Sequence, residues 1–149
     1  MNRNIVSCLC LVLLISVAKA NYSDCGSSLS NVTAIVVTDC TSSDSQCVLH
    51  RNTNVTIQIQ FIPKNDIQNV SAVVHGIILG VPIPFDLPNP DGCRDSGLAC
   101  PLKGGQTYAY QTSFPILKKY PRVSVDVKFE LEDPNSSDIT CSLIPSKIQ

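Results

Sequence analysis

Tryptophan is absent from this sequence of 149 residues, which also has only four phenylalanines, four tyrosines and one methionine. Charged residues make up 15% of the chain, and the single adjacent basic pair is Lys118-Lys119. Binding to nucleic acid depends on clustered cations that displace counterions from the phosphates. The sequence therefore argues against a nucleic-acid partner.

The motifs of common enzymes are also missing. There is no G-x-S-x-G turn, no H-E-x-x-H pair and no glycine-rich phosphate loop. The sequence also lacks C-x-x-C, and its two histidines, His50 and His75, lie far apart, which disfavours a zinc site. Glu130 and Glu132 fall on the polar face of an expected strand, where solvation explains them. We expect no catalysis, no metal and no cofactor.

The N-terminus has the pattern of a secretory signal peptide. An apolar run from Ile5 to Val17 follows one early cation, Arg3, and ends at the small-residue sequence Ala18-Lys19-Ala20. The run is short for a membrane span, so an uncleaved anchor is the weaker alternative. We therefore predict that residues 1–20 are removed.

The remaining residues 21–149 suit one domain with one sizeable core. Loss of Arg3 and Lys19 removes two of 11 basic residues and takes the formal net charge from −1 to −3. No later segment is long and apolar enough to cross a bilayer.

The cysteine count agrees with secretion. Cys8 and Cys10 leave with the signal peptide, and an even set of six remains in a chain bound for an oxidising compartment. Six cysteines allow 15 pairings, among which sequence alone cannot choose. Pairing near neighbours, Cys40 with Cys47 and Cys93 with Cys100, would close the shortest loops at the lowest cost in chain entropy. Cys25 would then be left to pair with Cys141.

The mature chain contains several N-x-S/T sequences that would accept a glycan if they face water. The candidates are Asn31, Asn54, Asn69 and Asn135. Asn21 also fits the pattern, but it would stand at the new terminus and is a doubtful acceptor.

Alternation of apolar and polar residues predicts β-strands. The alternation is clearest from Val55 to Phe61 and from Val123 to Leu131, as expected for strands with one buried face. Ser, Asp, Pro and Gly clusters separate the segments and leave no room for a useful amphipathic helix. Weaker strand patterns cover Val32 to Val37, Val70 to Leu79, Gln106 to Ser113, and Ile139 to Ile144. We predict an all-β, immunoglobulin-like sandwich.

The scarcity of aromatic residues leaves two alternatives for the interior. A core rich in Val, Ile and Leu can leave room for a ligand, but aliphatic residues can also pack to full density. Composition alone favours the filled core.

Residues 72–93 join an apolar strand to a proline-rich apolar segment. We interpret this segment as a rigid loop, in which Pro82 and Pro84 hold Ile83 and Phe85 in a fixed extended conformation. A rigid apolar loop suits the mouth of a pocket.

These residues and others resemble the Niemann-Pick disease type C2 protein family, within the ML lipid-recognition superfamily. The resemblance covers essentially the whole mature chain and includes the spacing of all six cysteines. It is carried by Asp24-Cys25-Gly26, Val74-His75-Gly76, Gly80-Val81-Pro82-Ile83-Pro84-Phe85, Pro90-Asp91-Gly92-Cys93, Cys100-Pro101, Thr107-Tyr108-x-Tyr110 and Tyr120-Pro121.

The resemblance implies a sandwich of about seven antiparallel strands whose sheets part to admit a sterol. It implies the disulfides Cys25–Cys141, Cys40–Cys47 and Cys93–Cys100. The residues that match positions at the family's sterol tunnel are Phe85, Ile116, Tyr120 and Pro121. The first two could instead be plain core and Tyr120 a packing residue at a strand edge.

The implied function is binding and transport of a sterol such as cholesterol, by a monomer in the extracellular space or the lysosomal lumen. We expect the apolar rim around Phe85 and Tyr120 to be the surface that contacts a membrane or an acceptor protein. A second hypothesis is that protonation of His75 near pH 5 alters loading.

Two departures concern the ligand. Phe129 and Ser142 stand where mammalian relatives carry Trp, and smaller groups could reshape the cavity. They suggest an arthropod or other invertebrate member. The alternative function is therefore a carrier or recognition protein for other apolar ligands, such as fatty acids, semiochemicals or bacterial lipids, presented to a receptor.

Overall fold

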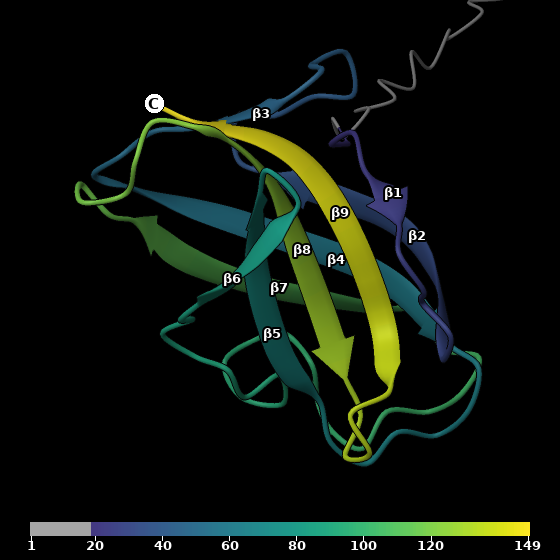
Figure 1. Cartoon of the computed structure of the whole chain (residues 1–149). Helices are drawn as coiled ribbons and strands as arrows, with labels where there is room; N and C mark the ends of the chain where they lie inside the picture. The colour runs from purple at the N-terminus through teal and green to yellow at the C-terminus, as the bar shows by residue number, and fades with distance from the viewer. Residues whose placement is uncertain (1–18) are drawn as a thin grey trace, which may run out of the picture.

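Two β-sheets stack face to face in the computed structural model, which describes residues 19–149 (Figure 1). Residues 1–18 of the predicted signal peptide, which spans residues 1–20, lie outside the described residues. The larger sheet has the order β1-β9-β8-β5-β6, with β3 added along β9, and the smaller has the order β2-β4-β7. The strands of the described part are β1 (Ser23–Asp24), β2 (Ser30–Val37), β3 (Cys47–Leu49), β4 (Thr53–Pro63), β5 (Ser71–Ile78), β6 (Val81–Phe85), β7 (Tyr108–Ile116), β8 (Ser124–Glu132) and β9 (Asp138–Ile148).

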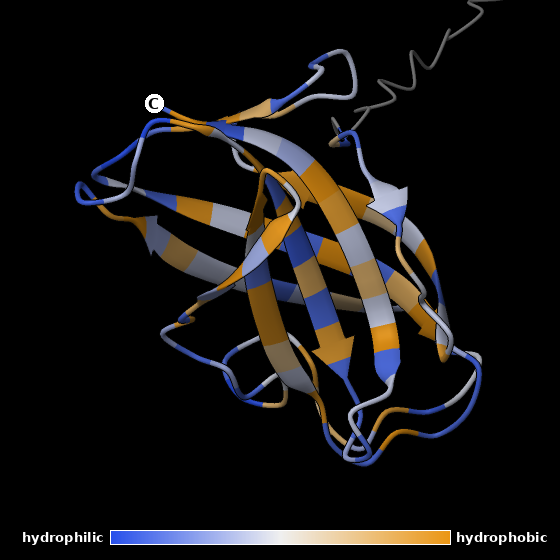
Figure 2. Cartoon of the chain, in the orientation of Figure 1, coloured by the Kyte–Doolittle hydropathy of each residue, from blue (hydrophilic) through white to orange (hydrophobic). Residues whose placement is uncertain are grey.

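The alternating sequence explains how the sheets stack. In β4, every second side chain from Val55 to Phe61 is at most 5% exposed, and the residues between them are half-buried or exposed. Figure 2 shows the same alternation as bands of apolar and polar colour along the strands. The apolar faces of both sheets are buried against each other, so the predicted all-β sandwich is confirmed.

The structure differs from the prediction in its smaller strands. Seven of the strands in residues 19–149 have five or more residues, and the short β1 and β3 add to them. All strand pairs are antiparallel except one, since β3 runs parallel to β9. A helix able to cross a membrane is not found among the described residues.

The prediction of a loop over residues 81–85 was wrong, because these residues form strand β6. β6 pairs with β5 from Ile78↔Val81 to Val74↔Phe85. Pro82 and Pro84 lack N–H groups but occupy alternate positions of a strand at the edge of the sheet, where prolines are tolerated. Their fixed φ suits an extended strand as well as it suits an extended loop.

Three disulfides join the pairs that the resemblance implies. Cys25–Cys141 links the segment after β1 to the centre of β9 and spans 116 residues of sequence. Cys40–Cys47 and Cys93–Cys100 each close a separation of seven residues. The side chains of Asn31, Asn54, Asn69 and Asn135 are all exposed, as glycan acceptors must be.

We expect the long disulfide to matter most for stability. Chain entropy predicts that replacing both Cys25 and Cys141 with Ala lowers the free energy of unfolding by about 5 kcal/mol, against about 2.5 kcal/mol for the pair Cys40 and Cys47, because the longer loop restricts the unfolded chain more. Urea unfolding of the two double variants measures the difference. Equal losses would contradict the entropic account.

Candidate functional site

An apolar pocket opens at the end of the sandwich near the C-terminus, between the β5–β6 hairpin and the segment that joins β7 to β8. Its volume is about 390 Å³, within the range of small-molecule sites. The residues that line it are mostly apolar: Gly76, Ile78, Ile83, Pro84, Phe85, Asp86, Leu117, Lys119, Tyr120, Pro121, Val125 and Ile148. We call this pocket the mouth.

A second, smaller cavity lies between the sheets behind the mouth. It has a volume of about 40 Å³, and its lining residues are Leu49, Val74, His75, Gly76, Phe85, Phe114, Ile116, Val125, Val127 and Ile148. We call it the inner cavity. Four residues line both spaces, so the two adjoin: Gly76, Phe85, Val125 and Ile148.

The Phe85 ring borders both the mouth and the inner cavity. Its centroid lies 5.5 Å from that of Phe114 in an edge-to-face contact and 5.4 Å from that of Tyr120. Such aromatic contacts hold a ring in place without fixing it covalently. A ligand that passes from the mouth to the space between the sheets therefore passes this ring.

The structure brings the predicted tunnel residues together at this end. Phe85, Tyr120 and Pro121 line the mouth, and Ile116, which is 2% exposed, lines the inner cavity. Burial, and to a smaller extent the charge of Asp86, raise the pKa of the Tyr120 hydroxyl. This side chain therefore stays neutral and faces the pocket as an amphipathic ring.

Gly76 keeps the pocket open on the β5 side. A Cβ atom at this position would lie 3.1 Å from Cγ2 of Val125, closer than most real contacts. Sequence reasoning placed Gly76 in a family pattern but did not assign it to the pocket. It also missed Phe114, Val125 and Ile148, because alternation marks a residue as buried without showing which buried residues border a cavity.

The rest of the interior is packed. Phe61, Tyr110 and Phe129 are at most 1% exposed and fill the centre of the sandwich. The inner cavity exceeds the 10–15 Å³ or so that one water needs, yet it is far smaller than a lipid. The core is thus filled over most of its length and hollow at one end, and a lipid must widen it.

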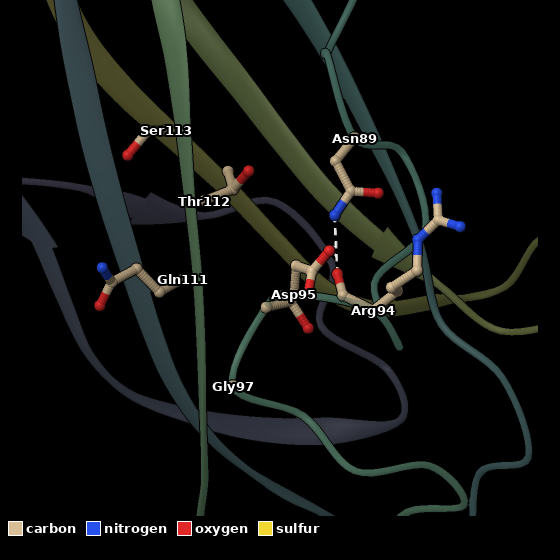
Figure 3. A pocket seen from close by; sticks show the side chains of 8 residues that line it. Asn89, Arg94, Asp95, Gly97, Gln111, Thr112 and Ser113 are labelled. Carbon is tan, nitrogen blue, oxygen red and sulfur yellow. Dashed lines mark hydrogen bonds between the residues drawn. The ribbon is translucent and has the colours of Figure 1, made fainter.

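A larger groove lies elsewhere and is polar. It has a volume of about 710 Å³ on the outer side of β7. Figure 3 shows Thr112 projecting from the strand toward the loop that carries Asn89 and Arg94, while Gln111 and Ser113 project to the other side. In that loop the Asn89 amide donates to the Arg94 carbonyl over 2.7 Å. Its open, polar lining suits water rather than an apolar ligand.

A charged cluster covers the outer face of the larger sheet, across from the pocket. The prediction that Glu130 is a solvated side chain was wrong, since the residue is only 9% exposed. One carboxylate oxygen, Oε1, lies 3.6 Å from Lys128 Nζ and 3.9 Å from His75 Nδ1. Lys128 on the same strand and His75 on the neighbouring β5 lie beside Glu130, and alternation along β8 could not reveal the contact from β5.

Asp138 joins this cluster from β9. Asp138 and Glu130 lie close to Cys141, but that cysteine is in a disulfide and offers no thiolate for a metal. Desolvation, then the hydrogen bond and charge of Glu130, raise the pKa of Asp138 from 3.8 to about 7. Between about pH 4 and about pH 7 the folded protein therefore holds a proton on Asp138 that the unfolded chain has already released.

We expect Asp138→Asn to change how stability depends on pH. The pKa of Asp138 in the folded state lies above the unfolded value. Ionisation of this carboxyl therefore lowers the free energy of unfolding as pH rises from about 4 to about 7. The variant should unfold at a higher temperature than the wild type at pH 7.5, and the difference should shrink at pH 4. Thermal melts across this range measure it, with Asp39→Asn at an exposed turn as the control for net charge.

Comparisons with known proteins agree with this architecture. The family model described as the ML domain matches residues 19–148. The chain is 46% identical to the ecdysteroid-regulated 16 kDa protein of Manduca sexta, covering 92% of this chain and 94% of that protein. It is 43% identical to NPC intracellular cholesterol transporter 2 homolog a of Drosophila melanogaster, covering 94% and 95%.

A solved structure supports the same relationship. The Niemann-Pick type C2 protein of the Japanese carpenter ant superposes with a TM-score of 0.82 at 33% identity, over 87% of this chain and 99% of that one. The likeness thus extends over nearly all the described residues.

Proposed function

The chain belongs to the ML domain family, and from that premise we propose that it binds a sterol or a similar apolar lipid and carries it through water without changing it chemically. The observation that supports this most directly is the apolar mouth that adjoins an inner cavity between the sheets, with the Phe85 ring bordering both. The predicted tunnel residues Ile116, Tyr120 and Pro121 line the same two spaces.

Burial alone can drive such binding. A sterol that hides roughly 400 to 500 Å² of apolar surface gains about 10 to 12 kcal/mol gross at about 25 cal/mol/Å². Lost rigid-body freedom, and here the work of displacing Phe85, reduce the net gain by several kcal/mol. What remains corresponds to micromolar to nanomolar affinity, which suits a carrier that must also release its ligand.

Secretion fits the same proposal. Three disulfides, the predicted signal peptide and four exposed sequons suit an extracellular or lumenal compartment. The alternative ligand, a fatty acid or bacterial lipid presented to a receptor, is distinguished by mass spectrometry of the apolar compound that co-purifies from the native source.

Phe85→Ala should weaken cholesterol binding by at least about 1 kcal/mol, because it removes the ring that closes over the ligand. Titration with a fluorescent sterol measures the change. Gln111→Ala, on the polar groove of β7, is the matched control and should bind as the wild type does. Unchanged affinity in the Phe85 variant would refute the assignment.

The mouth also carries the features of a membrane-docking surface. The tip of the β5–β6 hairpin is the two-residue turn Leu79-Gly80, and both residues have positive φ. Leu79 is 99% exposed in a backbone conformation that leucine rarely adopts. Val81 and Ile83, at 58% and 47% exposed, extend the apolar tip toward the mouth.

Cations lie in the segment that forms the other side of the mouth, where Lys119 is part of the lining. Lys118, Lys119 and Arg122 are exposed in the segment that joins β7 to β8, next to Leu117, which is 37% exposed. Apolar side chains that enter the interface, together with cations that attract anionic headgroups, are the usual means of reversible membrane contact. We infer that the lipid leaves through this surface directly into a bilayer.

Leu79→Asn should slow transfer of bound sterol to vesicles that contain anionic lipid and leave the equilibrium affinity for sterol unchanged. Asn tolerates the positive φ of this turn, so the fold is preserved. Replacing Lys118 and Lys119 with Ser should also slow transfer, and more so at low salt. Lys103→Ser, an exposed lysine outside the lining of the mouth, is the control, and equal slowing in it would contradict the surface.

A further inference from the structure

Three buried hydroxyl groups in the interior of the sandwich have no hydrogen-bond partner among residues 19–149. They belong to Tyr110 on β7 and to Thr140 and Ser142 on β9. Tyr110 is 1% exposed, and the other two are fully buried. Burying a hydroxyl without a partner costs free energy, so buried polar groups in proteins are nearly always satisfied.

The same fold satisfies its other buried hydroxyls close by. Ser30 Oγ donates to the Ile139 carbonyl over 2.6 Å, and Ser146 Oγ donates to the Ile144 carbonyl over 3.0 Å. Thr140 and Ser142 lie between these two sites along β9. Among the buried hydroxyl groups of residues 19–149, those without a partner therefore gather in this stretch of the interior.

The strand register places Thr140 and Ser142 on the core side of the larger sheet. Ser142 lies opposite Phe129, and Thr140 lies opposite Leu131. Opposed residues of an antiparallel pair point to the same face, and both partners here are fully buried in the core. Both hydroxyls therefore point between the sheets and not toward the charged outer face.

Along β9, the hydroxyls of Ser142 and Thr140 lie farther from the mouth than the inner cavity does. Val127, opposite Ile144, lines that cavity. A strand rises about 3.4 Å per residue, so the Phe129–Ser142 pair lies about 7 Å farther in. The next pair inward includes Thr140, about 14 Å from the cavity row. A lipid that fills the inner cavity and displaces the Phe129 ring reaches these positions.

Tyr110 supplies a hydroxyl from the opposite sheet. Its ring centroid lies 5.9 Å from that of Phe129, and it is four residues along β7 from Phe114, which lines the inner cavity. Burial raises the pKa of its hydroxyl to about 12, and a contact with the Thr112 side chain, which does not meet hydrogen-bond geometry, opposes this to a smaller extent. The group therefore remains a neutral donor and acceptor.

We propose that Tyr110, Thr140 and Ser142 hydrogen-bond to the buried end of the ligand, so that the protein selects a sterol-sized lipid with a hydroxyl or carbonyl group at that end. This specificity rests on the lipid-binding function proposed above. A plain hydrocarbon end would leave the hydroxyls unsatisfied, and an oxygenated end would satisfy them in a low-dielectric interior.

Two sterol probes test the proposal whichever way a sterol enters. 25-Hydroxycholesterol carries a hydroxyl at both ends, and 5α-cholestane carries none. The quantity to measure is the ratio of their dissociation constants, by competition against a fluorescent sterol, in the wild type and in the double variant Thr140→Val, Ser142→Ala. Any contribution of the outer hydroxyl is the same in both proteins, so the change in this ratio reports on the inner end alone.

We expect the double variant to lose at least about tenfold of the wild-type preference for 25-hydroxycholesterol, because a site built to bond a hydroxyl discriminates strongly against its absence. Tyr110→Phe, which deletes one oxygen, should reduce the preference as well. Ser30→Ala, which removes a buried hydroxyl that is already bonded, should leave it unchanged. An unchanged ratio in the double variant, with both sterols still bound, would overturn the proposal but not the carrier function.

If the wild type bound no sterol at all, the carrier function itself would fail and this proposal with it. A second measurement needs no ligand. Removing unsatisfied hydroxyls should raise the melting temperature of the ligand-free double variant, whereas Ser30→Ala should lower it. A fall in the double variant as large as that in Ser30→Ala would show that Thr140 and Ser142 are satisfied in the ligand-free fold, and would overturn the proposal.

Discussion

The pairing of β6 with β5 across the Leu79-Gly80 turn determines the character of the whole site. It places Phe85 opposite Val74 and holds its ring against Phe114 and Tyr120. That ring joins the edge of the larger sheet to the smaller sheet at one end. Because this closure consists of side-chain contacts alone, it can open for a ligand, while the disulfides and the paired strands keep the rest of the sandwich together.

Charged groups lie on the outer face of the larger sheet, and apolar groups lie between the two sheets. The charged cluster of His75, Lys128, Glu130 and Asp138 lies on the outer face of the larger sheet. The hypothesis that protonation of His75 alters loading is untested: the residue borders the inner cavity, while its imidazole Nδ1 lies 3.9 Å from Glu130 in the charged cluster. The apolar lining faces inward and ends at the mouth. A ligand is thus held by burial, and its specificity must come from the few polar groups inside.

Much of the fold follows from local pattern. Alternation located the six longest strands to within a few residues at most of their ends, because a half-buried strand repeats every two residues. It failed at β6, where prolines look like loop formers unless the segment is known to lie at a sheet edge. It failed again at Glu130, whose burial comes from Lys128 and from side chains on neighbouring strands. Both errors concern contacts between strands, which a single segment does not encode.

The sequence by itself determined the alternating strands, the even set of cysteines, the apolar β5–β6 segment and the likeness to the lipid-binding family. These are properties of residue type and spacing along the chain. Only the tertiary structure decided that the core is packed at its centre and hollow at one end, that Phe85 lies between two cavities, and that Tyr110, Thr140 and Ser142 are left without partners. The reason is physical: packing density and hydrogen-bond satisfaction depend on which side chains meet across two sheets, and residues far apart in the sequence set that together.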